Sequence, residues 1–328
     1  MVKRILVPLD GSELAEAALD HAVSVATTFG AEIVLLRVVP APSGMSRDAL
    51  ASSQSRMATA EAEAYLNRVS SALPPGGPPV ETLVSVGWAS DEILDAARRV
   101  DADFILLTSH GEGGHDRFET GGTMRLVLDA ARASVMVIRA GHPRRTQEGI
   151  GHYRRILAPV DGSKRGEWAL CLAASLAKAQ GAELLVVHVL TPPEVMAVEG
   201  QDKHVGQSLG LQLEVHNRQV AEQYLKATCT SMCAPDLEVR PLLVEGRNVA
   251  RALQETASKE GADLIVMSAH GRSPASGWSY GNQAYRVVTH GETDTIVLQD
   301  IPKVAGASGA TSMSLRSRAG GARRHWTH

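Results

Sequence analysis

The chain has 328 residues, of which 44% are hydrophobic, 21% charged and 4% aromatic, with a formal net charge of −3. This length favours about two domains, and the near-neutral charge and scarce aromatic residues argue against a nucleic-acid or membrane partner. Its three cysteines are an odd number without framework spacing, so we expect a reducing compartment. We find no signal peptide or membrane span in the sequence and expect a cytoplasmic location.

The first part of the chain alternates short apolar runs with helical patterns. Ser12 and Ser90 are expected to be helix N-caps, and Gly30 is expected to end the first helix. The predicted strands are Ile5–Pro8, Ile33–Val39, Val80–Val86, Asp103–Leu107 and Ser134–Arg139. The predicted helices are 12–29, 46–73, 90–100 and one that starts at 123.

The second part repeats the first. Asp10-Gly11-Ser12 recurs as Asp161-Gly162-Ser163, an offset of 161 − 10 = 151, while His110 and His270 differ by 270 − 110 = 160. We therefore predict a duplicated domain whose loops differ in length. The predicted domains are 1–141 and 153–301, with a linker at 142–152 and a disordered basic tail at 302–328. The second set of strands is expected at 155–159, 183–189, 238–244, 263–267 and 295–299.

Continuous apolar strands that alternate with helices predict a parallel sheet covered on both faces. Such sheets bind ligands beyond the carboxyl ends of their strands, where the strand order reverses. With the order 3-2-1-4-5, the reversal lies between strands 1 and 4 of each domain. Asp10, at the end of the first strand, would then share a crevice with the loop that follows the fourth strand.

That loop is rich in glycine in both copies. The first begins at His110-Gly111 and continues to Gly121-Gly122-Thr123, and the second runs from His270-Gly271 to Gly281-Asn282. A strand, a flexible loop and a helix N-terminus in this order form an anion site, since N–H groups and the helix dipole point at the loop. An ordinary strand-to-helix connection is the alternative interpretation.

Other catalytic motifs are weaker. Residues 277–281 match Gly-x-Ser-x-Gly, but the predicted strand ends near Ser268, too far away for a nucleophile elbow. Neither a dinucleotide fingerprint nor a phosphate-binding loop with Gly-Lys-Ser/Thr is present, which argues against a Rossmann dehydrogenase and a P-loop ATPase. Cys229 and Cys233 lack further ligands for a metal site.

Taken together, these motifs resemble the universal stress protein family. The resemblance rests on Val7–Ser12 and on Asp101–Gly111 with its repeat Gly261–Gly271, and it covers about residues 1–140 and 153–300. It implies two tandem, doubly wound, five-stranded α/β domains of Rossmann-like, adenine nucleotide α-hydrolase-like architecture. It also implies that the domains pair through their fifth strands, here within one chain, while further homodimerisation stays open.

The ATP-binding branch of this family carries Gly-x2-Gly-x9-Gly-Ser/Thr, and both copies depart from it. Thr108 and Ser268 replace the first glycine. The first copy reaches Gly122-Thr123 only with one extra loop residue, and the second has Asn282 after the last glycine. Thr and Ser are tolerable if the backbone φ is negative there.

The resemblance also assigns roles to the residues. The aspartates would accept hydrogen bonds from ribose or adenine, and the loop glycines would cradle the phosphates. The base would be flanked by Val38, Val189, Leu107 and Met267. The histidines would order the loop. The first site would comprise Pro8, Leu9, Asp10, Val38, Leu107, Thr108, His110, Gly111, Gly121, Gly122 and Thr123. The second would comprise Pro159, Val160, Asp161, Val189, Met267, Ser268, His270, Gly271, Gly281 and Asn282.

The resulting hypothesis is a stress-response or regulatory protein that binds ATP, with or without Mg²⁺, and turns it over slowly or not at all. No catalytic or metal-ligating residues are assigned. A module with empty crevices that binds unknown proteins is the alternative, and a slow ATPase is a third. In the structural alternative, Asp10 and Asp161 only hold the turns before the serines.

Overall fold

The computed structural model describes residues 2–41, 53–110, 122–139, 151–192, 203–232, 236–271 and 280–299. We call residues 2–139 the N-terminal repeat and 151–299 the C-terminal repeat. The N-terminal repeat contains β1 (Arg4–Leu9), α1 (Glu13–Glu16), α2 (Ala18–Phe29), β2 (Glu32–Pro40), α3 (Ser53–Ala72), β3 (Val80–Gly87), α4 (Ala89–Arg99), β4 (Phe104–Thr108), α5 (Gly122–Ala130) and β5 (Ser134–Ile138). The C-terminal repeat contains β6 (Arg155–Pro159), α6 (Lys164–Gln180), β7 (Glu183–Leu190), α7 (Lys203–Met232), β8 (Val239–Glu245), α8 (Val249–Glu260), β9 (Leu264–Ser268), α9 (Asn282–His290) and β10 (Asp294–Leu298).

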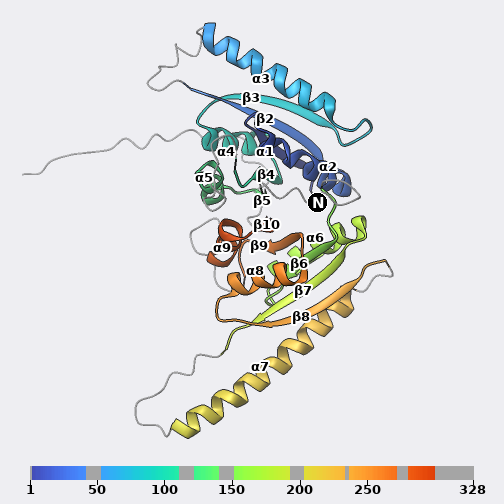
Figure 1. The fold of residues 1–328 in the computed structure, drawn as a ribbon, viewed down its shortest axis with the longest axis vertical. Helices are drawn as coiled ribbons and strands as arrows, with labels where there is room; N and C mark the ends of the chain where they lie inside the picture. Colours follow the sequence, from blue (N-terminus) through green and yellow to red (C-terminus); the bar gives the residue numbers. More distant parts are fainter. Residues whose placement is uncertain are drawn as a thin grey trace, which may run out of the picture.

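All ten of these strands belong to a single sheet. Its order is β3-β2-β1-β4-β5-β10-β9-β6-β7-β8, which is 3-2-1-4-5 in the first repeat and its mirror order in the second. Within each repeat every pairing is parallel. The predicted strand order is confirmed, and Figure 1 shows the sheet running through the molecule with helices along both sides.

The two repeats join through their fifth strands. β5 and β10 pair antiparallel, with Met136 opposite Ile296. Equivalent residues, 160 positions apart (299 − 139), make matching cross-repeat bonds. The Arg139 N–H donates to Asp294 Oδ1 at 2.8 Å, and the Gln299 N–H donates to Ser134 Oγ at 3.1 Å. The internal pairing predicted from the family resemblance is therefore present.

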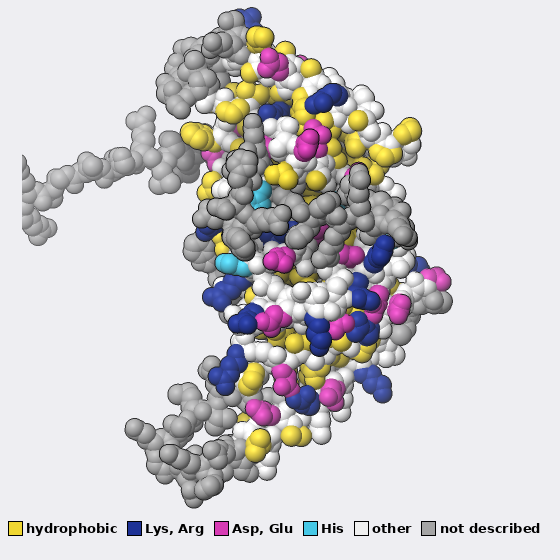
Figure 2. Space-filling model, in the orientation of Figure 1, with side chains coloured by type: hydrophobic (Ala, Val, Ile, Leu, Met, Phe, Trp, Pro, Cys, Tyr) yellow, Lys and Arg dark blue, Asp and Glu magenta, His cyan; other side chains and the backbone are white. Residues whose placement is uncertain are grey.

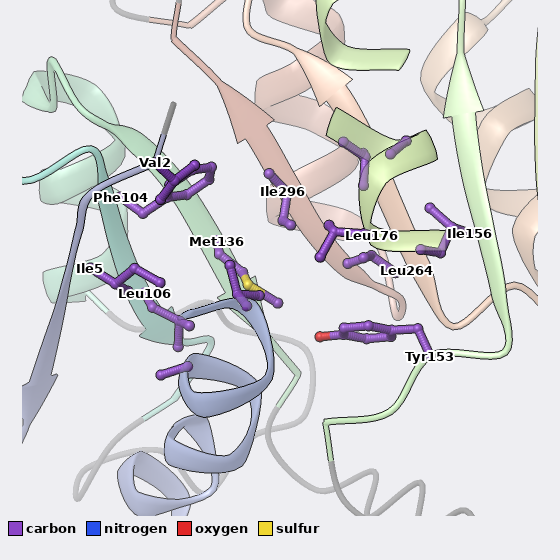
Figure 3. Packing of buried hydrophobic residues seen from close by; sticks show 14 of the residues in the cluster. Val2, Ile5, Phe104, Leu106, Met136, Tyr153, Ile156, Leu176, Leu264 and Ile296 are labelled. Carbon is purple, nitrogen blue, oxygen red and sulfur yellow. The ribbon is translucent and has the colours of Figure 1, made fainter. Parts of the chain in front are cut away.

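Each face of the sheet carries a hydrophobic cluster to which both repeats contribute. One includes Ile5 and Met136 from the first repeat with Ile156 and Ile296 from the second. In Figure 3 Met136 and Ile296 lie where the two halves meet, with Ile5 and Ile156 farther into each half. The Tyr153 ring, only 2% exposed, directs its hydroxyl toward the first repeat. Because the buried side chains are shared, we expect the repeats to unfold together.

Two of the three capping predictions are confirmed. Ser12 caps α1, with its Oγ accepting the Ala15 N–H at 3.1 Å, and Gly30 ends α2 in the left-handed region at φ 65°. Ser90 is not an N-cap, because α4 already begins at Ala89 after Trp88, which makes no side-chain cap bond. The helix therefore starts directly after β3, and Ser90 lies inside its first turn.

The predicted helix 12–29 is divided into α1 and α2 at Ala17, whereas its equivalent α6 is continuous. Nothing in the structure explains this difference. Part of helix 46–73, most of the linker and the whole tail lie outside the described residues, as does Cys233. Cys171 is exposed and Cys229 is buried.

Charged side chains of both signs alternate on the face shown in Figure 2, in keeping with the small net charge. Among the helices that the structure describes, none is long and apolar enough to cross a membrane.

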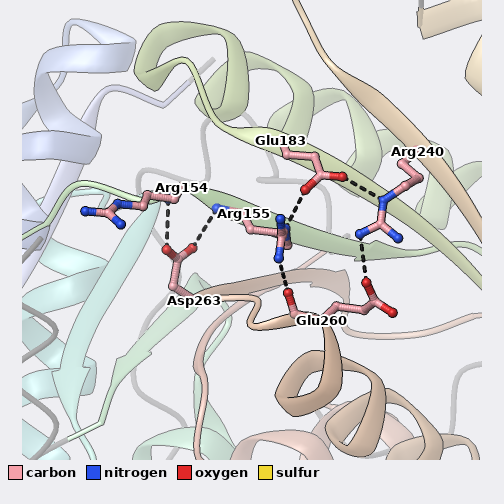
Figure 4. A network of polar contacts seen from close by, with 6 residues as sticks. All are labelled: Arg154, Arg155, Glu183, Arg240, Glu260 and Asp263. Atoms are coloured by element: carbon pink, nitrogen blue, oxygen red, sulfur yellow. Dashed lines mark hydrogen bonds and ion pairs between the residues drawn. The ribbon is translucent and has the colours of Figure 1, made fainter.

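At the amino ends of the strands, opposite the predicted site, an ionic network ties β6, β7, β8 and β9 together (Figure 4). Glu183 accepts hydrogen bonds from Arg155 Nε at 2.5 Å and from Arg240 Nε at 2.7 Å. Asp263 accepts the backbone N–H groups of Arg154 and Arg155. In the first repeat Asp103 does the same for residues 3 and 4. These acids therefore have structural partners away from the crevice.

Replacing Glu183 with glutamine should destabilise the fold at neutral pH by about 1–3 kcal/mol, since the charged hydrogen bonds are weakened. Burial raises the pKa of Glu183, but the bonds from Arg240 and Arg155 outweigh burial and lower it overall. A lowered pKa stabilises the fold above the unfolded value and loses that contribution as pH falls through the folded value. Urea unfolding at pH 7 and pH 3 should show a smaller deficit of the variant at pH 3 than at pH 7. An equal deficit at both pH values would contradict this account.

Candidate functional site

The candidate crevice lies at the carboxyl ends of adjacent strands in each repeat. β1 pairs with β4 in the register Ile5–Phe104, and β6 pairs with β9 in the register Ile156–Leu264. Continuing these registers places Asp10 level with Ser109, and Asp161 level with Ala269. Each aspartate is thus brought beside the start of the glycine-rich loop, as the strand order predicted.

In the C-terminal repeat the contact between the two is direct. A Cβ atom added to Gly271 would collide with Asp161 Oδ2 and lie 3.3 Å from its Cγ. Gly271, the first glycine of the loop, therefore lies against the carboxylate with no room for a side chain. Its counterpart Gly111 lies outside the described residues, as does Gly121.

Both aspartates also hold the turns that follow them. Asp10 Oδ1 accepts the Ser12 N–H at 3.0 Å and the Ser12 hydroxyl at 2.6 Å. Asp161 Oδ1 accepts the Ser163 N–H at 3.0 Å. The glycine between each pair has a positive φ, +86° at Gly11, which a residue with a side chain rarely adopts. The structural role considered for these aspartates is therefore real, and in the second repeat it occupies Oδ1 while Oδ2 faces Gly271.

The residues that replace the family's first glycine have a local function. Thr108 Oγ1 donates to the His110 carbonyl at 2.7 Å, and Ser268 Oγ donates to the His270 carbonyl at 2.9 Å. Asp101 alone among the described non-glycine residues has a positive φ, so neither replacement is strained. These bonds fix the chain at the loop entrance, and a glycine has no hydroxyl to make them.

A helix begins after each glycine-rich loop. Gly122 and Thr123 are the first two residues of α5, and both are exposed. Gly281 precedes α9 and Asn282 begins it. The Gly281 N–H donates to the Ala269 carbonyl at 2.8 Å, so this amide serves the fold. The first turn of α9 still offers N–H groups that have no partner within the helix.

The predicted base-flanking residues lie together on one face of the sheet. Leu107 and Met267 are buried in the same cluster, and Val38 and Val189 pack against it. In contrast, Leu9 and Val160 belong to the core of the opposite face, while Pro8 and Pro159 are partly buried strand residues. Each repeat thus supplies one apolar pair at the crevice face.

A polar group beside each crevice was missed. Arg37 Nη1 donates to the Leu9 carbonyl at 3.2 Å, and the guanidinium lies 5.7 Å from the centroid of the Tyr65 ring. At the equivalent position, 37 + 151 = 188, His188 Nδ1 lies 2.7 Å from the Val160 carbonyl oxygen, and its ring meets Tyr224 edge-on at 5.9 Å. A polar residue at the same place in two apolar strands was the available signal.

Within the part of the chain that is described, no group of three or more His, Cys, Asp or Glu residues could hold a metal ion. Most of the Gly-x-Ser-x-Gly match at 277–281 lies outside those residues, but β9 ends at Ser268, as the argument against a nucleophile elbow requires.

A family model described as the universal stress protein family matches residues 1–139 and again residues 152–299. The chain belongs to the universal stress protein family. A universal stress protein of Methanocaldococcus jannaschii is 27% identical over 141 residues, which cover 42% of this chain and 83% of that protein. One from Mycobacterium tuberculosis is 27% identical over 198 residues, 60% of this chain and 62% of the relative, so the match spans less than two thirds of its length.

Solved structures agree with the fold of this universal stress protein. A universal stress protein from Archaeoglobus fulgidus matches with a TM-score of 0.61 at 20% identity, covering 90% of this chain and 98% of the other. A putative universal stress protein from Pseudomonas aeruginosa matches with a TM-score of 0.62 at 20% identity, covering 90% and 93%. At this identity the likeness concerns the fold alone.

Proposed function

We propose that this universal stress protein binds an adenine nucleotide, ATP, at the carboxyl ends of β1 and β4, of β6 and β9, or of both pairs. The observation that carries the proposal is the contact between Asp161 Oδ2 and the position where Gly271 would carry a side chain. The carboxylate and the phosphate-loop glycine share one crevice, as a site spanning ribose and phosphates requires.

The chemistry of the groups in this crevice favours one end for the nucleoside and the other end for the phosphates. A carboxylate accepts hydrogen bonds from ribose hydroxyls or an adenine amino group, so it belongs at the nucleoside end. Phosphates favour the N-terminus of α9, where backbone N–H groups and the helix dipole attract anions. Met267 and Val189 supply the apolar surface beside the base. Mg²⁺, where present, would arrive with the phosphates as its main ligands.

Slow or absent turnover is part of the proposal. The aspartates of each crevice already serve its turns: Asp10 Oδ1 accepts the Ser12 N–H, and Asp161 Oδ1 accepts the Ser163 N–H. A phosphoryl-transfer site needs a base that positions water and a metal held in line. We therefore favour a cytoplasmic protein that senses or sequesters nucleotide over an enzyme. An interaction module that binds other proteins with empty crevices is the competing function.

Asp161→Asn is the sharpest test of the site. Asparagine keeps an acceptor for the Ser163 N–H but replaces the charge beside Gly271, so the fold should persist while ATP affinity in the C-terminal repeat falls about tenfold or more. Isothermal titration with ATP and Mg²⁺ measures this loss, and Asp10→Asn repeats the test in the other crevice.

Glu255→Gln is the matched control for charge, since Glu255 is an exposed residue of α8 that pairs with Arg251. It should leave the titration unchanged. Wild-type affinity in the Asp10/Asp161 double variant would exclude the proposed crevices, and heat-silent titration of the wild type would favour the interaction module.

A further inference from the structure

Tyr280 immediately precedes the first turn of α9, yet it is anchored to the other repeat. Its side chain is 5% exposed and lies in the hydrophobic cluster to which both repeats contribute. Its hydroxyl donates to the carbonyl of Ala133, in the connection between α5 and β5, at 3.2 Å. Burial raises the pKa of Tyr280, so the hydroxyl remains a donor at neutral pH.

The segment that receives this bond is itself fixed. Gln299 Nε2 donates to the Ala131 carbonyl at 3.3 Å, and the Gln299 backbone N–H donates to Ser134 Oγ at 3.1 Å. Three hydrogen bonds from the C-terminal repeat thus converge on residues 131–134 of the N-terminal repeat. Tyr280 is consequently attached to a rigid support at the repeat interface.

The backbone after Tyr280 is held from its own repeat as well. The Gly281 N–H donates to Ala269 O at 2.8 Å, and a Cβ on Gly281 would approach that oxygen to 2.8 Å. The Gly281 carbonyl then accepts the Tyr285 N–H at 3.0 Å, which begins the helix. The start of α9 is therefore clamped between the exit of β9 and the N-terminal repeat.

We propose that Tyr280 is a positioning residue that fixes the first turn of α9 by anchoring it to the N-terminal repeat. So far as the ligand is concerned, the inference rests on the proposed function, because that turn is where the nucleotide phosphates would bind. The C-terminal crevice is then preorganised only within the tandem, and its phosphate affinity depends on the neighbouring repeat.

The test compares Tyr280→Phe with Tyr153→Phe in the full chain without nucleotide. Tyr280→Phe keeps the ring and removes the bond to Ala133, whereas Tyr153→Phe removes a different cross-repeat hydroxyl bond, to His21, in the hydrophobic cluster of the opposite face. Amide hydrogen exchange of Tyr285 should accelerate about tenfold in Tyr280→Phe and stay unchanged in Tyr153→Phe. Unchanged exchange in Tyr280→Phe, or equal acceleration in both variants, would overturn the positioning role.

A second readout uses ATP titration in an Asp10→Ala background, where the C-terminal crevice is the one left to measure. Tyr280→Phe should weaken ATP binding about tenfold there, and Tyr153→Phe should not weaken it. Faster exchange with unchanged ATP affinity would overturn the link between the turn and the crevice. A chain that binds no ATP in any form refutes the proposed function, while the exchange result still decides whether Tyr280 holds the helix.

Discussion

Replacing Ile296 with alanine is expected to lower the free energy of unfolding by about 3 kcal/mol and to destabilise both repeats at once. Ile296 is fully buried at 0% exposure, and it pairs with Met136 across the β5–β10 junction. The loss combines the transfer free energy of the deleted methyl groups with the cavity they leave. Because the hydrophobic cluster contains both repeats, the loss should be shared by the whole chain.

Urea unfolding followed by both circular dichroism and intrinsic fluorescence measures this effect. We expect one transition that shifts as a unit in Ile296→Ala. Leu126→Ala is the control, since Leu126 is 56% exposed on α5 and its truncation should change stability by less than about 0.5 kcal/mol. Two separate transitions, with only the later one shifted by Ile296→Ala, would contradict a shared core.

The second large effect is a loss of stability between about pH 6.5 and pH 4 caused by His21. Its side chain is only 12% exposed at the junction, and its Nδ1 lies 2.6 Å from the Tyr153 hydroxyl and 3.8 Å from Asp294 Oδ2. Burial lowers the pKa of His21 to about 4. Between about pH 6.5 and pH 4, His21 is therefore mostly neutral in the folded protein and mostly protonated in the unfolded chain.

Proton binding decides in which direction the free energy of unfolding changes with pH. Below the unfolded pKa of about 6.5 the unfolded state binds more protons, so stability falls with pH until the folded pKa near 4 is reached. A shift of this size corresponds to about 3 kcal/mol at the acid end. The neighbouring Asp20 acts in the opposite sense, since burial raises its pKa.

Comparison with His21→Gln isolates the histidine, because glutamine can still bond to the Tyr153 hydroxyl but does not titrate. The free energy of unfolding of the wild type, measured relative to that of the variant, should fall by about 3 kcal/mol from pH 7 to pH 4. Parallel stability curves for the two proteins over this range would show that His21 is not responsible.

The architecture could be predicted from the sequence because its signals are local or repeated. The offset of 151 between Asp10 and Asp161 revealed the duplication, and continuous apolar strands predicted the parallel sheet. The turn Asp10-Gly11-Ser12 was readable because its glycine and cap act locally. The meeting of Asp161 with the loop was predictable from strand order alone.

Features that depend on long-range packing were not predictable. Ser90 has the right side chain for a cap, but the end of β3 starts the helix earlier. Tyr280 looked like part of a loop motif, and only the fold brings it to Ala133, a residue far away in the sequence. Arg37 and His188 were visible as polar residues within apolar strands, but their position beside the crevice came from the pairing of β1 with β2 and of β6 with β7.

Extraction of bound nucleotide tests the central claim most directly. The protein is purified without added nucleotide and denatured, and the supernatant is separated on an ion-exchange column with absorbance detection. We predict an adenine nucleotide at about one or two equivalents per chain, one for each occupied crevice. A supernatant free of nucleotide, together with no thermal shift in millimolar ATP and Mg²⁺, would contradict nucleotide binding and leave the interaction module as the function of this tandem.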